Sequence, residues 1–182
     1  MEPELNEVLE KELREKLVGK TLTHLELFII SDNFFVFEEE KRYVVDAGIG
    51  LLIGDTKFIF AWDTEKELFC LSHESMKSLL GDKEYFRLND DEIAGLRELI
   101  GQTIENISCK WNFFQEYDEE GELKEDKTYI PIDIQLHFNN GRTLHLAAIE
   151  FAISAKDHSL MNPRYNSQAN LYVGVDHFLS IT

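Results

Sequence analysis

Apolar residues recur every three or four positions in two stretches of the chain, and this spacing predicts two amphipathic helices. The first covers about residues 3–17 and the second about residues 90–100, where Asn89 is suited to be the N-cap. A short third helix is predicted between Ser72, as its cap, and Gly81, as its stop. The apolar positions are Leu5, Val8, Leu9, Leu13 and Leu17 in the first helix and Ile93, Leu96, Leu99 and Ile100 in the second.

Between and after these helices, apolar and polar residues alternate, which predicts β-strands. Residues 25–30 and 34–37 are expected to form two strands joined by a tight polar turn at residues 31–33. Gly48 and Gly50 interrupt the next strand pattern, which predicts a bulge or a close approach of two backbones. Further strands are expected at residues 43–45, 51–53, 58–62, 68–71, 103–114 and 171–181, and a polar loop at residues 161–168.

The clearest hairpin lies between residues 130 and 146. A two-residue turn at Asn140 and Gly141 would place apolar residues of one strand opposite polar residues of the other. A three-residue turn with Gly141 in the left-handed conformation keeps apolar residues opposite each other. It pairs Leu136 with Leu144 and Ile134 with Leu146, and it places Asp133, Gln135, His137, Thr143 and His145 together on the other face.

The segment that links a helix to a strand occurs twice in the chain. Gly19 and Gly101 stand 82 positions apart, and each follows an amphipathic helix directly, where a left-handed C-cap favours glycine. A threonine stands two positions after each glycine and begins an alternating run. We therefore interpret residues 1–88 and 89–182 as candidate diverged copies of one helix-plus-meander unit.

Together these elements predict an α+β fold that is mostly antiparallel β-sheet with two or three packed helices. The chain of 182 residues is 43% hydrophobic, which suffices for one well-packed core. We expect a single domain over residues 1–182, built from the two candidate copies.

The charge of the chain narrows the choice of partner. Thirty-five acidic and eighteen basic residues give a net charge of -17. Nucleic acid and anionic membrane are disfavoured, because binding to phosphate requires clustered lysine or arginine. A basic protein remains a suitable partner, although the same charge also serves solubility.

The two cysteines and the amino-terminal sequence indicate a cytoplasmic location. Cys70 and Cys109 lie in apolar, alternating runs without a metal-binding or redox spacing, so buried, reduced thiols are expected. The acidic amino-terminal sequence lacks the basic and apolar regions of a secretory signal, and no apolar run approaches the ~20 residues of a membrane span.

The most acidic stretch, residues 115–127, has almost nothing to bury and is expected to form a loop or the tip of a long hairpin. It offers no register for an EF-hand calcium loop. Together with the charged turn at residues 38–42, it is the surface we expect to bind a partner. The candidate residues are Tyr117, Glu119, Glu120 and Glu122, with Glu38, Glu39 and Glu40.

A second candidate site is the polar face of the hairpin. Asp133, His137 and His145 are residue types that bind metals or exchange protons, and one face of a rigid strand pair brings them together. The same residues are also ordinary on a sheet face that contacts water.

Motifs of common enzymes are missing from the sequence, including GxSxG, GxxxxGK[ST], GxGxxG and HExxH. We therefore expect a non-enzymatic cytoplasmic protein-binding module without a cofactor, an inhibitor or immunity-type protein of a basic partner. The alternatives are a small-ligand or metal-binding protein or hydrolase using the His137 and His145 face, and a purely structural module.

Overall fold

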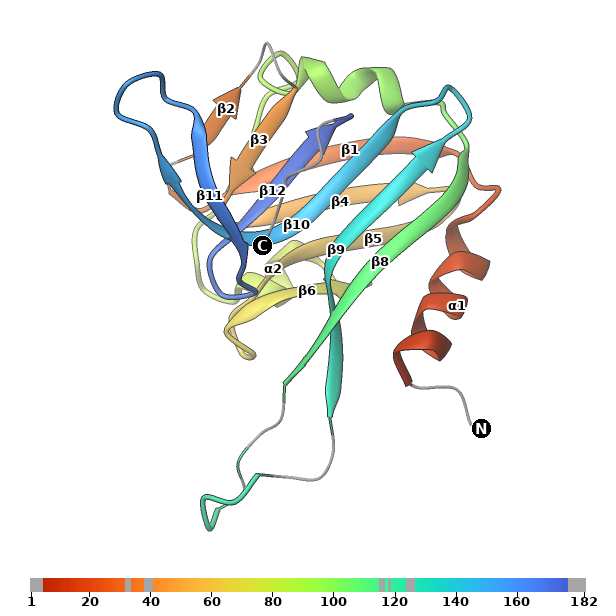
Figure 1. The fold of residues 1–182 in the computed structure, drawn as a ribbon. Helices are drawn as coiled ribbons and strands as arrows, with labels where there is room; N and C mark the ends of the chain where they lie inside the picture. Colours follow the sequence, from red (N-terminus) through yellow and green to blue (C-terminus); the bar gives the residue numbers. More distant parts are fainter. Residues whose placement is uncertain are drawn as a thin grey trace.

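The computed structural model describes residues 5–31, 34–37, 41–114, 117, 119–123 and 127–176, and within them the strands form two antiparallel sheets that face each other (Figure 1). The small sheet has the order β6-β5-β4-β1-β7 and contains β1 (Leu22–Ile29), β4 (Gly48–Ile53), β5 (Thr56–Asp63), β6 (Leu68–Ser72) and β7 (Phe86–Arg87). The large sheet has the order β2-β3-β12-β10-β9-β8, and β11 pairs with β10 outside this path. Its strands are β2 (Phe35–Phe37), β3 (Arg42–Val45), β8 (Ile104–Phe114), β9 (Thr128–Phe138), β10 (Thr143–Ile153), β11 (Leu160–Tyr165) and β12 (Asn170–Val175). This confirms the prediction of a fold made mostly of antiparallel sheet.

The core lies between the two sheets, because alternate residues of their strands point toward each other. Leu27 and Phe60 of the small sheet belong to the same buried cluster as Leu136 and Val173 of the large sheet. Both halves of the chain therefore contribute to one core, and burial of this apolar surface is the main force that holds the sheets together.

Helix α1 (Leu5–Leu17) packs beside β8 and closes one open side of the sandwich (Figure 1). Leu13 and Leu17 are buried as the pattern predicts, whereas Val8, nearer the start of the helix, is 36% exposed. Arg14 forms an ion pair with Glu10, one helical turn away, at 2.9 Å. Among the described residues, no helix is long and apolar enough to cross a membrane.

The second predicted helix is shorter than expected and is a 3₁₀ helix, η2 (Ala94–Leu99). Ile93, Leu96 and Leu99 are buried at a spacing of three, which matches three residues per turn, while Ile100 is 40% exposed. Asn89 does not cap the helix with its side chain; its N–H donates instead to the Glu92 carboxylate at 2.7 Å.

The short helix α2 (Met76–Leu80) ends at Gly81 as predicted, but its cap differs from the prediction. Ser75, rather than Ser72, accepts the hydrogen bond from the Ser78 N–H at 3.1 Å. Ser72 accepts from the Glu74 N–H and so shapes the turn before the helix. Ser72 and Ser75 both precede this helix, and the sequence pattern does not distinguish which of the two caps it.

The strands at residues 22–29 and 35–37 do not form the predicted hairpin. β1 belongs to the small sheet and pairs with β4 and β7, whereas β2 belongs to the large sheet and pairs with β3. The chain leaves β1 where the Asp46 carboxylate accepts hydrogen bonds from the backbone N–H groups of Ile30 and Ser31, at 2.7 and 3.1 Å. Asp46 therefore supports the crossing from one sheet to the other.

The predicted register of the hairpin between β9 and β10 is confirmed. Leu144 pairs with Leu136 and Leu146 pairs with Ile134. Gly141 has φ +77°, the left-handed conformation that a three-residue turn requires.

The two helix-to-strand segments lie side by side in the structure. Gly19 and Gly101 both have positive φ, +78° and +86°. Thr21 and Thr103 pair across the contact, with their hydroxyl oxygens 3.2 Å apart. The backbone hydrogen bonds of this contact form two pairs, in which one bond is the other shifted by 82 positions. The Gly19 N–H donates to the Ile104 carbonyl oxygen (2.8 Å), and the Gly101 N–H donates to that of Leu22 (2.7 Å). The Leu22 N–H donates to the Gln102 carbonyl oxygen (2.9 Å), and the Ile104 N–H donates to that of Lys20 (2.9 Å).

The predicted loop at residues 161–168 includes a strand. β11 pairs with β10 through Ile149 and Tyr165, on the same edge of β10 that β9 occupies nearer its start. Pro163 and the polar residues around it do not form an alternating pattern, and proline within a sheet is largely confined to edge strands and bulges. The sequence therefore predicts a loop here. β12 ends at Val175, and residues 177–181 of the predicted closing strand lie outside the described residues.

Candidate functional site

The most prominent feature outside the core is a two-stranded arm formed by the distal parts of β8 and β9. β9 pairs with β10 only through residues 133–137, whereas β8 and β9 stay paired as far as Phe114 and Thr128. Beyond Asp133 the hairpin no longer pairs with β10, although Ile130 and Ile132 still pack in a buried cluster with residues of the small sheet. Past these residues the hairpin extends away from the sandwich (Figure 1). A register shift between Lys110 and Trp111 marks the point where the strand bends.

The tip of the arm brings together residues predicted to bind a partner. Tyr117 is 67% exposed and pairs with Leu123, which is 54% exposed. Glu119, Glu120 and Glu122 are exposed between them. The other predicted acidic residues, Glu38, Glu39 and Glu40, lie outside the described residues, so the structure does not place them relative to the tip.

Between the tip and the base of the arm, aromatic side chains pack against each other and against a lysine. The rings of Phe113 and Tyr129 pack across the two strands, with their centroids 6.0 Å apart. The Lys127 ammonium lies 4.3 Å from the centre of the Phe113 ring, although this ring is still 45% exposed. Phe113 was not predicted as a site residue, because alternating apolar residues in a strand ordinarily indicate core. Leu123, the one aliphatic residue of the acidic stretch 115–127, was not predicted either.

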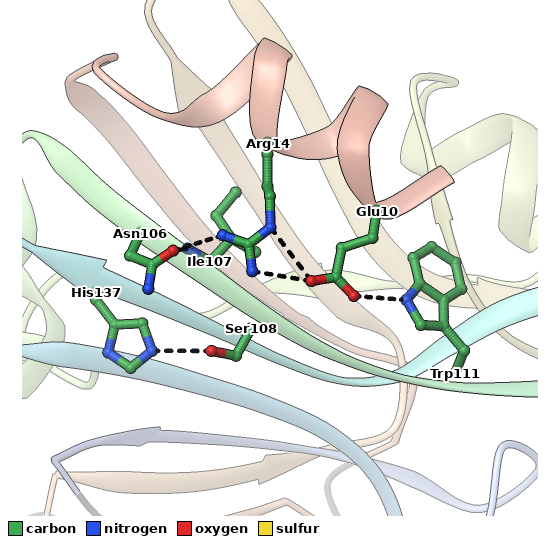
Figure 2. Close-up of polar contacts among 7 residues, drawn as sticks. All are labelled: Glu10, Arg14, Asn106, Ile107, Ser108, Trp111 and His137. Carbon is green, nitrogen blue, oxygen red and sulfur yellow. Dashed lines mark hydrogen bonds and ion pairs between the residues drawn. The ribbon is translucent and has the colours of Figure 1, made fainter. Parts of the chain in front are cut away.

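The base of the arm is fastened to α1 by a chain of polar contacts (Figure 2). Glu10 accepts a hydrogen bond from the Trp111 indole N–H at 3.3 Å and pairs with Arg14. Arg14 in turn donates to the Asn106 side-chain oxygen at 2.5 Å. These contacts fix the orientation of the Trp111 indole and cover the edge of β8 with the helix.

The polar face of the large sheet contains a second group, and here Asp133 and His145 do meet. Asp133 Oδ2 lies 2.9 Å from His145 Nε2 and accepts a hydrogen bond from the Tyr165 hydroxyl at 2.6 Å. The Lys110 ammonium lies 4.1 Å from the centre of the Tyr165 ring, and the Tyr172 ring contacts His145 edge-on at 5.5 Å. Tyr165 and Lys110 were not predicted as site residues, since the pairing of β11 with β10 was not predicted.

The environment sets which of Asp133 and Tyr165 carries the proton at neutral pH. Burial acts to raise the pKa of Asp133, but its contacts with His145, Tyr165 and Gln135 outweigh burial and hold that pKa below its usual value. Burial, followed by the bond to Asp133, raises the pKa of Tyr165 above its usual value. Asp133 is therefore the acceptor and Tyr165 the donor at neutral pH.

The third predicted residue of this site, His137, has different partners. His137 Nδ1 lies 3.1 Å from the Thr143 hydroxyl, and its Nε2 lies 3.4 Å from the Ser108 hydroxyl (Figure 2). The five polar residues thus share a face as predicted but form two separate contacts. In the described part of the chain, no group of three or more His, Cys, Asp or Glu side chains has a metal-binding arrangement.

Cys70 is buried as expected, whereas Cys109 is only partly buried. Burial raises the pKa of Cys70 to about 11 and that of Cys109 to about 12. Neither thiol is ionised at neutral pH, so neither has the character of a nucleophile.

Comparisons with known proteins give no match to this chain. No family model, no curated protein and no solved structure is similar to it.

Proposed function

We propose that this protein is a non-enzymatic protein-binding module, of the inhibitor or immunity type, that holds a basic partner with the tip of its arm. The observation that carries the proposal is the projecting arm with Tyr117 and Leu123 exposed among acidic residues. Exposed aromatic and apolar side chains are costly on a free surface and are common at the centres of interfaces.

The charge of the tip favours a basic partner. Glu119, Glu120 and Glu122 are exposed on a chain whose net charge is -17. Complementary charge accelerates association and excludes partners of the wrong sign, whereas the aromatic side chains supply most of the affinity. We add Glu38, Glu39 and Glu40 to the proposed surface on sequence grounds.

The proposal is tested by affinity capture from source-cell lysate, followed by titration of the identified partner against variants. We expect a stoichiometric basic protein that is released by high salt. The variant E119Q/E120Q/E122Q should slow association about fivefold or more at low salt, and Tyr117→Ala should mainly speed dissociation.

A matched control separates the arm from the overall charge. The variant E65Q/E67Q/E84Q removes the same number of exposed carboxylates from other parts of the molecule. If both triple variants slow association equally, the arm tip is not the binding surface. If neither changes the association rate, electrostatic recognition is excluded.

The polar face supports a second candidate function, a small-ligand or acid–base site. The observation that favours this function is the contact of Asp133 with both His145 and Tyr165, because such a contact orients the imidazole ring of His145. Against it, His145 is 1% and Asp133 4% exposed, so a substrate would have to open the sheet face to reach them. We therefore rank this function second.

We also propose that the two halves are diverged copies and that the protein is cytoplasmic. The strand orders β6-β5-β4-β1 and β12-β10-β9-β8, each preceded by a helix, and the reciprocal bonds around Thr21 and Thr103 support the duplication. The unpaired thiols of Cys70 and Cys109 support a reducing compartment.

A further inference from the structure

A cavity of about 180 Å³ lies where α1, the small sheet and the base of the arm meet. Phe58 of β5, Trp111 of β8 and Tyr129 of β9 form aromatic walls, and Pro131 adds an apolar surface. An apolar cavity of about 150 Å³ accommodates a benzene molecule. The cavity therefore has room for a single six-membered aromatic ring, with a substituent that reaches toward the opening.

The walls of this cavity are held in place before any ligand arrives. The Trp111 indole N–H donates to Glu10 at 3.3 Å, and Glu10 is itself held by Arg14 (Figure 2). On the other side, the Phe58 ring packs against His73 with centroids 4.7 Å apart. Such preorganised walls lower the entropic cost of binding.

Two opposite charges of α1 line the same cavity. Glu12 and Lys16 stand one helical turn apart, a spacing that favours an ion pair. Within the described residues, however, no ion pair joins them, nor does either bond another described side chain, in contrast to the neighbouring pair of Glu10 and Arg14. The cavity thus offers one negative and one positive group beside an aromatic enclosure.

The adjoining outer depression shares Lys16 and His73 with the cavity and adds Asp55 and Lys57, so the formal charges of the cavity and the depression together balance. His73 Nδ1 lies 3.0 Å from the Lys57 carbonyl oxygen, which fixes the ring at the entrance. A ligand with one charged group would find a partner of opposite charge at this opening but would also face a group of like charge. A zwitterion has a partner of opposite charge for each of its two groups.

We propose that this cavity binds a free aromatic amino acid with a single six-membered ring. The ring occupies the space between Phe58, Trp111 and Tyr129, the carboxylate of the ligand pairs with Lys16, and its ammonium pairs with Glu12. This inference is independent of the arm tip and of the proposed protein partner.

The experiment uses L-phenylalanine as the probe and follows the indole N–H signal of Trp111 by NMR. We expect a saturable shift with a Kd of about 1 mM or tighter, a value suited to a ligand of this size. L-alanine, which lacks the ring, should produce no shift. The cavity-filling variant Leu9→Trp should abolish the shift, since Leu9 also lines the cavity.

Two charge variants test the assigned pairs against analogues that carry one charge each. Lys16→Gln should weaken the binding of L-phenylalanine and 3-phenylpropionate at least about threefold but leave the binding of phenethylamine unchanged. Glu12→Gln should weaken the binding of L-phenylalanine and phenethylamine but leave that of 3-phenylpropionate unchanged. Lys11→Gln, on the same helix but outside the cavity lining, is the control and should change none of the affinities.

The proposal has clear ways to fail. Absence of a Trp111 shift at about 10 mM L-phenylalanine, far above the expected Kd, overturns the site. A shift that ignores both charge variants overturns the assigned ion pairs and leaves a purely apolar pocket. Stronger binding of either singly charged analogue than of L-phenylalanine overturns the zwitterion assignment.

Discussion

Asp133 shows how a polar residue is stabilised within a sheet face. Its Oδ2 atom contacts both the Tyr165 hydroxyl and His145 Nε2, at 2.6 and 2.9 Å. Because an ionised carboxylate accepts these contacts better than a protonated one, they offset the cost of burying its charge. The residue therefore contributes to stability only while it is ionised.

We predict that Asp133→Asn destabilises the protein by about 1–3 kcal/mol at neutral pH, because a buried acceptor of two contacts is weakened. The folded-state pKa of Asp133 lies below its unfolded value of about 3.9, so its contribution is complete above pH 5 and is lost as the pH falls through the folded-state pKa. Urea unfolding at pH 7, 5, 3.5 and 2.5 should therefore show the two proteins converging at the lowest values.

The control for this prediction is Asp55→Asn in the exposed turn between β4 and β5, which should change stability little at any of these pH values. A deficit of Asp133→Asn that stays constant down to pH 2.5 would mean that lost packing, not lost charge, causes the destabilisation.

At this scale the sequence predicts neighbours along a strand better than neighbours across the fold. The pairing of Leu136 with Leu144 follows from alternation and from the demands of a glycine turn, so it was predictable. The contact between Asp133 and Tyr165 depends on β11 joining β10 at the edge that β9 vacates. No local pattern encodes that choice.

At the scale of elements, β4 shows what an interrupted strand pattern signifies. Gly48 and Gly50 were expected to mark a bulge or a close backbone approach, and Gly48 does mark a close approach. A Cβ atom at Gly48 would lie 2.5 Å from the Ala61 Cβ and 2.6 Å from the Phe60 carbonyl oxygen of β5. Glycine at this position allows β4 and β5 to pair without distortion.

Gly48→Ala is therefore predicted to destabilise the protein by about 1–3 kcal/mol, because the strands must separate or twist to admit the methyl group. Gly50→Ala is a matched control on the same strand, since its Cβ would lie at an ordinary 3.5 Å from the Phe28 ring. Chemical denaturation of both variants measures the difference. Equal costs would show that the loss reflects glycine's role in the strand in general rather than the contact with Ala61.

The elements also show where local pattern stops being sufficient. The helix near residue 95 was predicted, and its spacing of three between buried residues explains the 3₁₀ form in retrospect. The crossing from β1 to β2 was not predicted, because a turn within one sheet and a passage between two sheets have the same polar composition. Asp46, which accepts backbone bonds at this crossing, is distant in sequence from the residues it supports.

At the scale of the whole molecule, the two sheets and the helices that precede β1 and β8 have matching arrangements. The contact of residues 19–22 with residues 101–104 lies where the two halves meet, with the same bonds made in both directions. The two halves differ elsewhere: β2 and β3 of the first half belong to the large sheet, and the second half extends the arm. The arm tip, which we propose to bind a partner, belongs to one of these differences.

The net charge of -17 has a consequence for the molecule as a whole. Exposed ion pairs such as Arg97 with Asp90, at 2.6 Å, contribute little individually, so repulsion among the excess carboxylates should dominate the electrostatic free energy at low salt. We predict that the free energy of unfolding rises as sodium chloride increases from about 20 to 200 mM, since the screening length falls to below about 10 Å over this range.

The triple variant E65Q/E67Q/E84Q, with three fewer negative charges, tests the cause of this salt dependence. It should be more stable than the natural sequence at low salt, and its stability should rise less with sodium chloride, because less repulsion is left to screen. Urea titrations at several salt concentrations measure both effects. If the natural chain instead loses stability with added salt, its ion pairs outweigh the repulsion. Basic side chains elsewhere on the surface would then balance the charge of the acidic arm, and little excess negative potential would remain to attract a basic partner.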